Sequence, residues 1–157
     1  TLHFSIGAHP AFNCPLKEGE KQEDYFLGFD TEKPLESNVL GDDGFVSEET
    51  EFFYPENGKL AIKPSLFDHN TLIIEHDQVH QVSLLTPDGQ EYVKVSFEAP
   101  LVGIWTPIEK NAPFMCIEPW YGRSDRSNFN QQLVEREYGQ AIEPGEIFEK
   151  SYTIEVK

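Results

Sequence analysis

Short apolar stretches separated by turn residues run along the whole chain, and they constrain its fold more than any other feature. Residues 92–97 (YVKVSF) show this most clearly, because apolar and more polar side chains alternate there. That period of two is typical of a half-buried antiparallel strand. Residues 86–89 (TPDG) form a strong turn signal, since Pro presets φ and Gly accepts a positive φ. We therefore expect a hairpin that joins a strand near residues 79–85 to the strand at 92–97.

Further strands are expected where apolar runs lie between Gly, Pro, Asn and Asp residues. They fall at residues 3–7, 25–29, 60–62, 71–75, 101–105, 114–118 and 148–156. A helical turn or two is expected only within residues 128–138. The acidic segment 30–51 is interpreted as loop with short strand pieces, and as the least ordered part of the chain. Many short strands and almost no helix predict an all-β fold, an antiparallel β-sandwich, formed as a single domain by residues 1–157.

Charge and cysteine content narrow the classes of function. The formal net charge is -16, which disfavours nucleic acids and anionic membranes as partners, because both attract basic surfaces. No apolar run approaches the length of a membrane span, and no signal peptide is visible. Cys14 and Cys116 lie far apart and form no disulfide framework. We interpret them as free, partly buried thiols of a cytoplasmic protein.

Residues 114–125 (FMCIEPWYGRSD) carry the most chemistry in the chain. The apolar run predicts a buried strand that ends at Glu118, because Pro119 cannot donate to a sheet ladder. Two large aromatic residues follow at once, and a carboxylate beside exposed aromatic rings is typical of a sugar site. Trp120 is expected to form a wall of that site, whereas Trp105 either stacks on a sugar or packs in the core. Glu118 alternatively pairs with Arg123.

Two segments, residues 5–13 (SIGAHPAFN) and 115–122 (MCIEPWYG), resemble the catalytic-site motifs of aldose 1-epimerases, the galactose mutarotase-like superfamily. The similarity is greatest to a bacterial branch of that superfamily. Residues 66–72 (LFDHNTL), 103–106 (GIWT) and 142–146 (IEPGE) match in the same order. The resemblance implies a large β-sandwich (a supersandwich), of which this chain looks like the C-terminal half. It also implies a cofactor-free interconversion of the α and β anomers of a hexose.

By this resemblance, His9 is the general acid and Glu118 the general base. Ring opening needs one proton removed from the C1 hydroxyl and one delivered to the ring oxygen. A His with a pKa near ~6.5 and a Glu with a pKa near ~4.3 suit these roles around neutral pH, and no metal is required. We expect the two side chains to face each other with room for a pyranose between them. Alternatively, His9 is a turn residue that hydrogen-bonds to the backbone.

The resemblance also implies a carboxylate near residues 68–70 that contacts sugar hydroxyls. Asp68 occupies that position in one alignment and Asn70 in the other, while the composition also suits an Asx-type turn. Asn13, which ends the first motif, completes the predicted substrate-binding residues together with Trp105 and Trp120.

Two other functions fit parts of the sequence. The first is a non-catalytic carbohydrate-binding module, and the second is a metal-dependent enzyme that uses some of the five His residues. His76 and His80 are spaced by four, but they lie in a segment expected to be strand and turn rather than helix. As partners we expect a small-molecule sugar, and a missing N-terminal segment or a second copy that covers sheet edges left open in half a sandwich.

Overall fold

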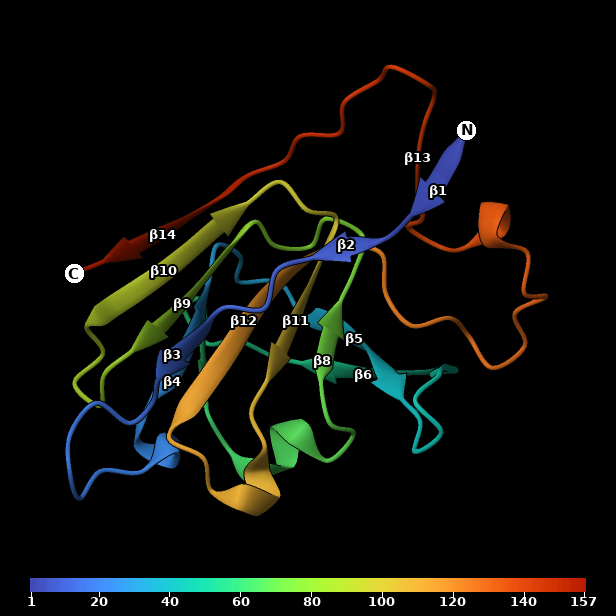
Figure 1. Cartoon of the computed structure of the whole chain (residues 1–157). Helices are drawn as coiled ribbons and strands as arrows, with labels where there is room; N and C mark the ends of the chain where they lie inside the picture. The colour runs from blue at the N-terminus through green and yellow to red at the C-terminus, as the bar shows by residue number, and fades with distance from the viewer.

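The computed structural model describes residues 1–157 and consists almost entirely of β-strands (Figure 1). The strands are β1 (Leu2–Phe4), β2 (Ile6–Gly7), β3 (Ala11–Asn13), β4 (Phe26–Phe29), β5 (Leu35–Leu40), β6 (Val46–Phe53), β7 (Lys59–Ala61), β8 (Leu72–Ile74), β9 (Gln81–Leu85), β10 (Glu91–Phe97), β11 (Leu101–Trp105), β12 (Phe114–Tyr121), β13 (Gln140–Ile142) and β14 (Tyr152–Val156). Short 3-10 turns lie at η1 (Gln22–Asp24), η2 (Pro64–Phe67), η3 (Ile108–Lys110) and η4 (Leu133–Glu135). None of these turns has the length or apolar character needed to cross a bilayer.

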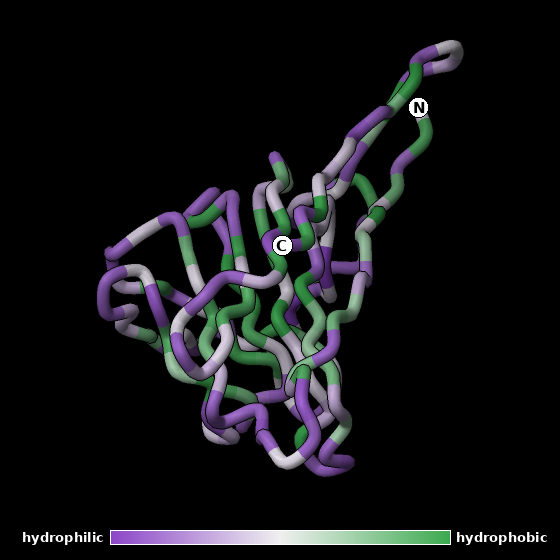
Figure 2. The backbone as a smooth tube through the Cα atoms, turned by 90° about the vertical axis from the view of Figure 1, so that its left-hand side faces the viewer, coloured by the Kyte–Doolittle hydropathy of each residue, from purple (hydrophilic) through white to green (hydrophobic).

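The strands form two facing antiparallel sheets and one small ribbon. The first sheet has the order β14-β10-β9-β4-β7. The second has the order β2-β12-β11-β8-β5-β6, and β3 pairs with β12 beyond β2 along the same edge. β1 and β13 form a separate two-stranded ribbon that extends away from the sandwich (Figure 2). The predicted antiparallel β-sandwich is thereby confirmed.

The core lies between the two sheets and is filled by alternate residues of each strand. On β10, Val93, Val95 and Phe97 are buried, as the period of two predicts. On the facing sheet, Met115 and Ile117 of β12 join the same apolar cluster. The alternate residues Cys116 and Glu118 therefore point to the outer face of that sheet.

Residues 30–51 were expected to be loop with short strand pieces, and the strands there are longer than expected, because this segment supplies all of β5 and most of β6. These two strands pair with each other over nearly their whole length. β5 has polar residues at buried positions: Ser37 is 2% exposed, and its hydroxyl accepts a hydrogen bond from the Ile73 amide at 2.9 Å. β6 is an edge strand with charged, exposed residues, a composition that protects an edge against aggregation.

The predicted end of a strand at Glu118 is also wrong, since β12 continues through Pro119 to Tyr121. The carbonyl of Pro119 still accepts a hydrogen bond from the amide of Ala8 at 3.0 Å. Pro119 lies opposite the interruption between β2 and β3, and a missing amide donor costs less at such a break. The helical turn expected within residues 128–138 is present as η4, and the final strand begins at Tyr152 rather than at residue 148.

Candidate functional site

Strand register brings the two motifs together on the outer face of the second sheet. β12 pairs with β3 at Cys116 and Ala11, and with β2 at Trp120 and Gly7. The register is the same on both sides of the interruption, so the pairing line places His9 directly opposite Glu118. Directly opposed residues of an antiparallel pair point to the same face, so both side chains leave the sheet on its outer side.

The imidazole and the carboxylate are in direct contact. His9 Nε2 lies 3.3 Å from Glu118 Oε1, with His9 63% and Glu118 5% exposed at the side chain. The other carboxylate oxygen, Oε2, accepts a hydrogen bond from the indole Nε1 of Trp120 at 3.2 Å. The edge of the Trp105 ring meets His9 at a centroid distance of 6.0 Å. The pair therefore leaves no room for a pyranose between its members, and a sugar would lie over both, which corrects the expected arrangement.

Two glycines make space for the Trp120 indole beside Glu118. A Cβ on Gly103, which lies opposite Glu118 on β11, would meet Trp120 Cη2 at 2.4 Å. A Cβ on Gly7 of β2 would meet Trp120 Cδ1 at 2.5 Å. The indole thus lies across the backbones of both neighbouring strands, and this placement directs its N–H at the carboxylate.

The buried position of Glu118 changes its proton affinity. Burial raises the pKa of this carboxyl above its usual range, while the charge of His9 and the hydrogen bond from Trp120 act in the opposite direction. Next to it, burial and then the charge of Glu118 raise the pKa of the Cys116 thiol to about 11. His9, Cys116 and Glu118 place their ligand atoms within 4.8 Å of one another and could hold a metal ion. A proton competes with any such ion, because Cys116 must lose its proton to bind one.

A cavity of about 440 Å³ lies over the pair, within the size range of small-molecule sites. Its lining residues come from both motifs, from the strands beside them and from the chain after β12: Ser5, Ile6, Gly7, Ala8, His9, Leu40, Thr71, Ile73, Glu118, Trp120, Gly122, Arg123, Ser124 and Arg136. Sequence reasoning did not select Thr71 or Arg136 as site residues, although Thr71 lies within the matching segment 66–72.

A buried ion network holds the wall that follows β12. The side chain of Arg123 is 1% exposed and pairs with Glu75, which is 2% exposed, and with Glu137. Tyr138 donates a hydrogen bond to Glu75 Oε2 at 3.2 Å, and Arg136 Nη2 donates one to the Arg123 carbonyl at 3.1 Å. Arg123 therefore pairs with Glu75 and Glu137 rather than with Glu118, its alternative partner in the sequence interpretation.

The structure brings together only some of the predicted site residues. His9, Glu118 and Trp120 line the cavity, and Trp105 borders it through its contact with His9. The remaining three, Asp68, Asn70 and Asn13, are exposed and do not line it.

Local contacts account for two of these three residues. Asn70 has a φ of 72°, and its side-chain oxygen accepts a hydrogen bond from Thr71 at 3.0 Å, which fits the turn interpretation of this segment. The carbonyl of Asn13 accepts a hydrogen bond from the Tyr92 hydroxyl at 2.7 Å. Their roles in sugar binding stay predictions.

The two histidines spaced by four do not converge on one site. His76 Nδ1 lies 2.9 Å from the Tyr138 hydroxyl, whereas His80 Nε2 lies 3.9 Å from Asp77 Oδ1.

Comparison with known proteins relates the chain to longer ones. No protein-family model matches it. The plasmid and chromosomal LacX proteins of Lactococcus lactis are each 32% identical over 159 residues, which cover 99% of this chain and 53% of LacX. The chain thus spans about half the length of the curated relatives that it matches.

Solved structures show the same fold and the same partial coverage. A galactose mutarotase related enzyme from Lactobacillus acidophilus superposes with a TM-score of 0.86 at 28% identity, covering 99% of this chain and 52% of that one. A galactose mutarotase-like protein from Lactobacillus casei superposes with a TM-score of 0.78 at 23% identity, covering 98% of this chain and 51% of that one. At this identity the likeness shows the fold alone. The chain therefore has a galactose mutarotase-like fold, of which it spans about half.

Proposed function

We propose that this chain carries the acid–base centre of an aldose 1-epimerase, which interconverts the α and β anomers of a hexose. The observation that carries the proposal is the pair itself: His9 and Glu118 lie 3.3 Å apart on the wall of one cavity. The galactose mutarotase related enzyme from Lactobacillus acidophilus supports the same class of reaction by its likeness to the chain. The free thiols of Cys14 and Cys116 agree with a cytoplasmic location.

The contacts of Glu118 suggest how a sugar enters. Trp120 already donates to Oε2, so we assign Oε1 as the oxygen that receives a sugar hydroxyl once His9 has moved off it. The imidazole is free to move, since 63% of its side chain is exposed. The C1 hydroxyl then takes the place of His9 at Oε1, and the protonated imidazole turns to the ring oxygen.

The reaction then needs two proton transfers in each direction. Glu118 removes the proton of the C1 hydroxyl while His9 protonates the ring oxygen, and the bond from C1 to that oxygen breaks to give the open-chain aldehyde. C1 rotates about its bond to C2. His9 then takes the proton of the C5 hydroxyl, which attacks the other face of C1, and Glu118 returns its proton to the carbonyl oxygen. Each positioned group contributes about 10²–10⁴-fold to such a step.

The test follows a freshly dissolved single anomer of glucose or galactose by NMR. We expect the protein to accelerate equilibration, and His9→Asn and Glu118→Gln each to remove the acceleration. His69 and Glu51 form a matched control, because they are an exposed His–Glu pair 3.1 Å apart outside the cavity. His69→Asn and Glu51→Gln should therefore retain the wild-type rate. Full acceleration by both His9→Asn and Glu118→Gln would contradict the acid–base assignment.

One observation favours a second candidate, a carbohydrate-binding module without catalysis. Each oxygen of Glu118 already has a partner within the protein, so the side chain is held in place without a substrate. Sugar-induced shifts in protein NMR spectra without faster anomerisation would favour this module over the enzyme.

A further inference from the structure

The outer face of β12 places a thiol beside the acid–base pair, and the proposed reaction makes no use of it. Cys116 and Glu118 are alternate residues of this strand, and the register places His9 opposite Glu118. We propose that His9, Cys116 and Glu118 form a site for a thiophilic divalent cation such as Zn²⁺, and that the bound ion blocks the acid–base pair. The blocking rests on the proposed function, whereas the metal site itself does not.

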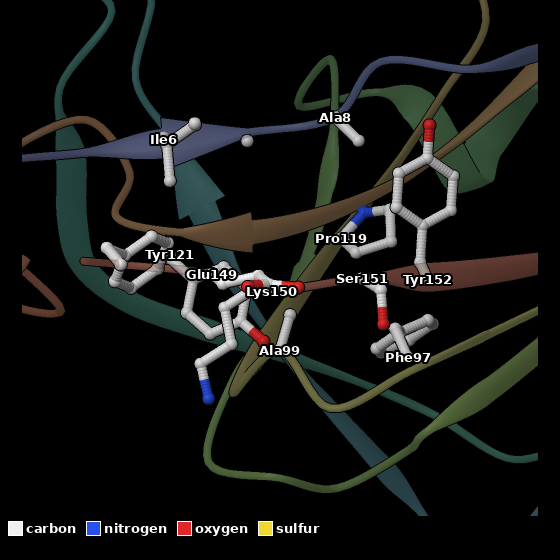
Figure 3. A pocket seen from close by; sticks show the side chains of 12 residues that line it. Ile6, Ala8, Phe97, Ala99, Pro119, Tyr121, Glu149, Lys150, Ser151 and Tyr152 are labelled. Carbon is white, nitrogen blue, oxygen red and sulfur yellow. The ribbon is translucent and has the colours of Figure 1, made fainter.

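Alternation along β12 gathers the three ligands on one face of the strand. Pro119 and Tyr121 point to the opposite face, where they line a separate cavity between the two sheets (Figure 3). Cys116 points to the outer face, and its sulfur lies within 4.8 Å of the ligand atoms of His9 and Glu118. The thiol is free, so no disulfide competes for it. Strand geometry therefore brings an imidazole, a thiol and a carboxylate together without a local sequence motif for metal binding.

The chemistry of these ligands selects the kind of ion. A thiolate and an imidazole favour Zn²⁺, whereas Mg²⁺ and Ca²⁺ prefer oxygen ligands. A zinc ion with three protein ligands keeps a fourth position for water. The cavity of about 440 Å³ over His9 and Glu118 gives solvent access to that position. The formal net charge of -16 also raises the concentration of cations near the protein surface.

The distances suit a tetrahedral ion after a small movement. Zinc–ligand bonds of about 2.0–2.3 Å place neighbouring ligand atoms roughly 3.3–3.7 Å apart at tetrahedral angles. His9 Nε2 and Glu118 Oε1 are already 3.3 Å apart, and the sulfur of Cys116 needs to approach them by at most roughly 1.5 Å. The His9 side chain is 63% exposed, so its ring can turn to admit an ion from the cavity.

A bound ion would stop the proposed reaction directly. It would occupy lone pairs on His9 Nε2 and Glu118 Oε1, the two atoms that carry protons during ring opening. The thiol of Cys116 must release its proton to solvent when the sulfur–metal bond forms, so binding to neutral His9 releases one proton for each ion bound. The metal-free protein is therefore the active form, and the ion is an inhibitor rather than a cofactor.

The experiment titrates the whole metal-free chain with Co²⁺, because the absorption spectrum of this ion reports its ligands. We expect one ion per chain and a thiolate-to-cobalt charge-transfer band in the near ultraviolet, which Zn²⁺ removes and Mg²⁺ does not. Cys116→Ser should abolish the band. His9→Asn should weaken Co²⁺ binding by about tenfold or more, and it tests the site independently because His9 is exposed and tolerates substitution.

The NMR anomerisation assay tests the blocking of the pair. Zn²⁺ should inhibit the wild-type chain, and a chelator should restore its rate. The rate of Cys116→Ser should be insensitive to the Zn²⁺ concentration that inhibits wild type.

Two matched variants separate this site from other groups of the chain. Cys14→Ser should keep the cobalt band, because Cys14 lies in the core and in no comparable cluster. His69→Asn alters an exposed His–Glu pair that has no thiol, so it should keep the wild-type affinity for Co²⁺. Circular dichroism of each variant distinguishes a lost ligand from lost folding.

Each half of the proposal has its own contrary result. Absence of the cobalt band, or a band lost in Cys14→Ser and kept in Cys116→Ser, would overturn the metal site. Unchanged or faster anomerisation with Zn²⁺ bound would overturn the blocking. A chain that shows the band but no anomerisation without metal would support the site and refute the enzyme, so the two failures are distinguishable.

Discussion

At the residue scale, the site depends on how one carboxylate is held. Glu118 is nearly buried, with one oxygen against His9 and the other against Trp120. Burial and hydrogen bonding act on its pKa in opposite directions. The indole N–H is the part of this arrangement that a small substitution removes most cleanly.

Trp120→Phe should move the acid limb of the pH–rate profile to higher pH. The substitution removes a hydrogen bond that lowers the pKa of Glu118, so the carboxyl stays protonated to a higher pH and the base is lost earlier on acidification. A hydrogen bond to a charged group is worth about 1.5–3 kcal/mol, which corresponds to about one to two pH units. Anomerisation rates by NMR between pH 4 and 8 measure the limb. An unchanged limb, or one at lower pH, would show that Trp120 does not act on the carboxylate.

Glu118→Gln should change the pH dependence of stability with a defined sign. A carboxyl whose folded pKa is raised stabilises the fold below its unfolded pKa, and that contribution is lost as pH rises through the folded pKa. Since Gln does not titrate, the variant should gain stability relative to wild type between pH 4 and 7. The gain is about 1.4 kcal/mol for each unit of upward shift. Urea denaturation at three pH values tests this, and a constant difference would refute it.

Sequence alone predicted that His9 and Glu118 belong to one site, but it did not predict the residues around them. Residues 5–13 and 115–122 predicted His9 and Glu118 because each lies in a recognisable local motif. Arg136 enters the cavity from a segment without any motif, so only the folded chain reveals it. The direct contact between His9 and Glu118 depends on a register that continues across a break between strands, which local patterns do not specify.

At the scale of elements, β12 connects every part of the site. Its inner residues Met115 and Ile117 fill the core, and its outer residues Glu118 and Trp120 line the cavity. The sequence interpretation ended this strand too early because it took Pro119 as a stop, although its carbonyl still accepts the Ala8 amide. It underestimated the length of β5 and β6 because their charged and polar residues resemble a loop. In the structure, the polar residue Ser37 is buried where β5 pairs with β8, and the charged strand β6 lies at the edge of the sheet.

Gly103→Ala should disable the site at a modest cost in stability. Its Cβ would lie 2.4 Å from a rigid indole, so Trp120 must move away from Glu118. We expect activity to fall about tenfold or more and stability to fall by about 1–3 kcal/mol. Gly28→Ala is the matched control, because its Cβ would meet Ser83 Oγ at 2.5 Å in the other sheet. That variant should lose stability while tryptophan fluorescence and activity stay unchanged, and equal losses of activity in both would contradict the argument.

Glu75→Gln should destabilise the fold through the segment that follows β12. The change leaves the buried guanidinium of Arg123 with only Glu137 as a charged partner. Breaking a buried pair from one side costs about 3–5 kcal/mol, whereas replacing both partners costs far less. The double variant E75Q/R123M should therefore regain much of the stability lost in Glu75→Gln. Urea denaturation gives the free energy of unfolding of both variants. A loss below about 1 kcal/mol in Glu75→Gln would show that the ion network does not stabilise the segment after β12.

At the scale of the whole molecule, the question is whether half of a relative's length folds as one cooperative unit. The two sheets share one apolar cluster that extends from Cys14 and Tyr25 to Ile117. Against this, β14 and the β1–β13 ribbon lie at the margin with exposed apolar residues. A probe on each face of the second sheet can separate cooperative from partial unfolding.

The two cysteines provide such probes. Cys14 lies in the core between the sheets, whereas Cys116 lies on the outer face of β12, and they are 0% and 1% exposed. Burial raises the pKa of each thiol to about 11, so only about one in 10⁴ is ionised at pH 7. We expect both thiols to react with Ellman's reagent only when the chain unfolds, and therefore at one common rate. The urea midpoint of this reactivity should equal the urea midpoint measured by circular dichroism. As a control, the chain unfolded in guanidinium chloride should show two reactive thiols. Faster reaction of Cys116 alone would show that the outer face of the second sheet opens independently of the core.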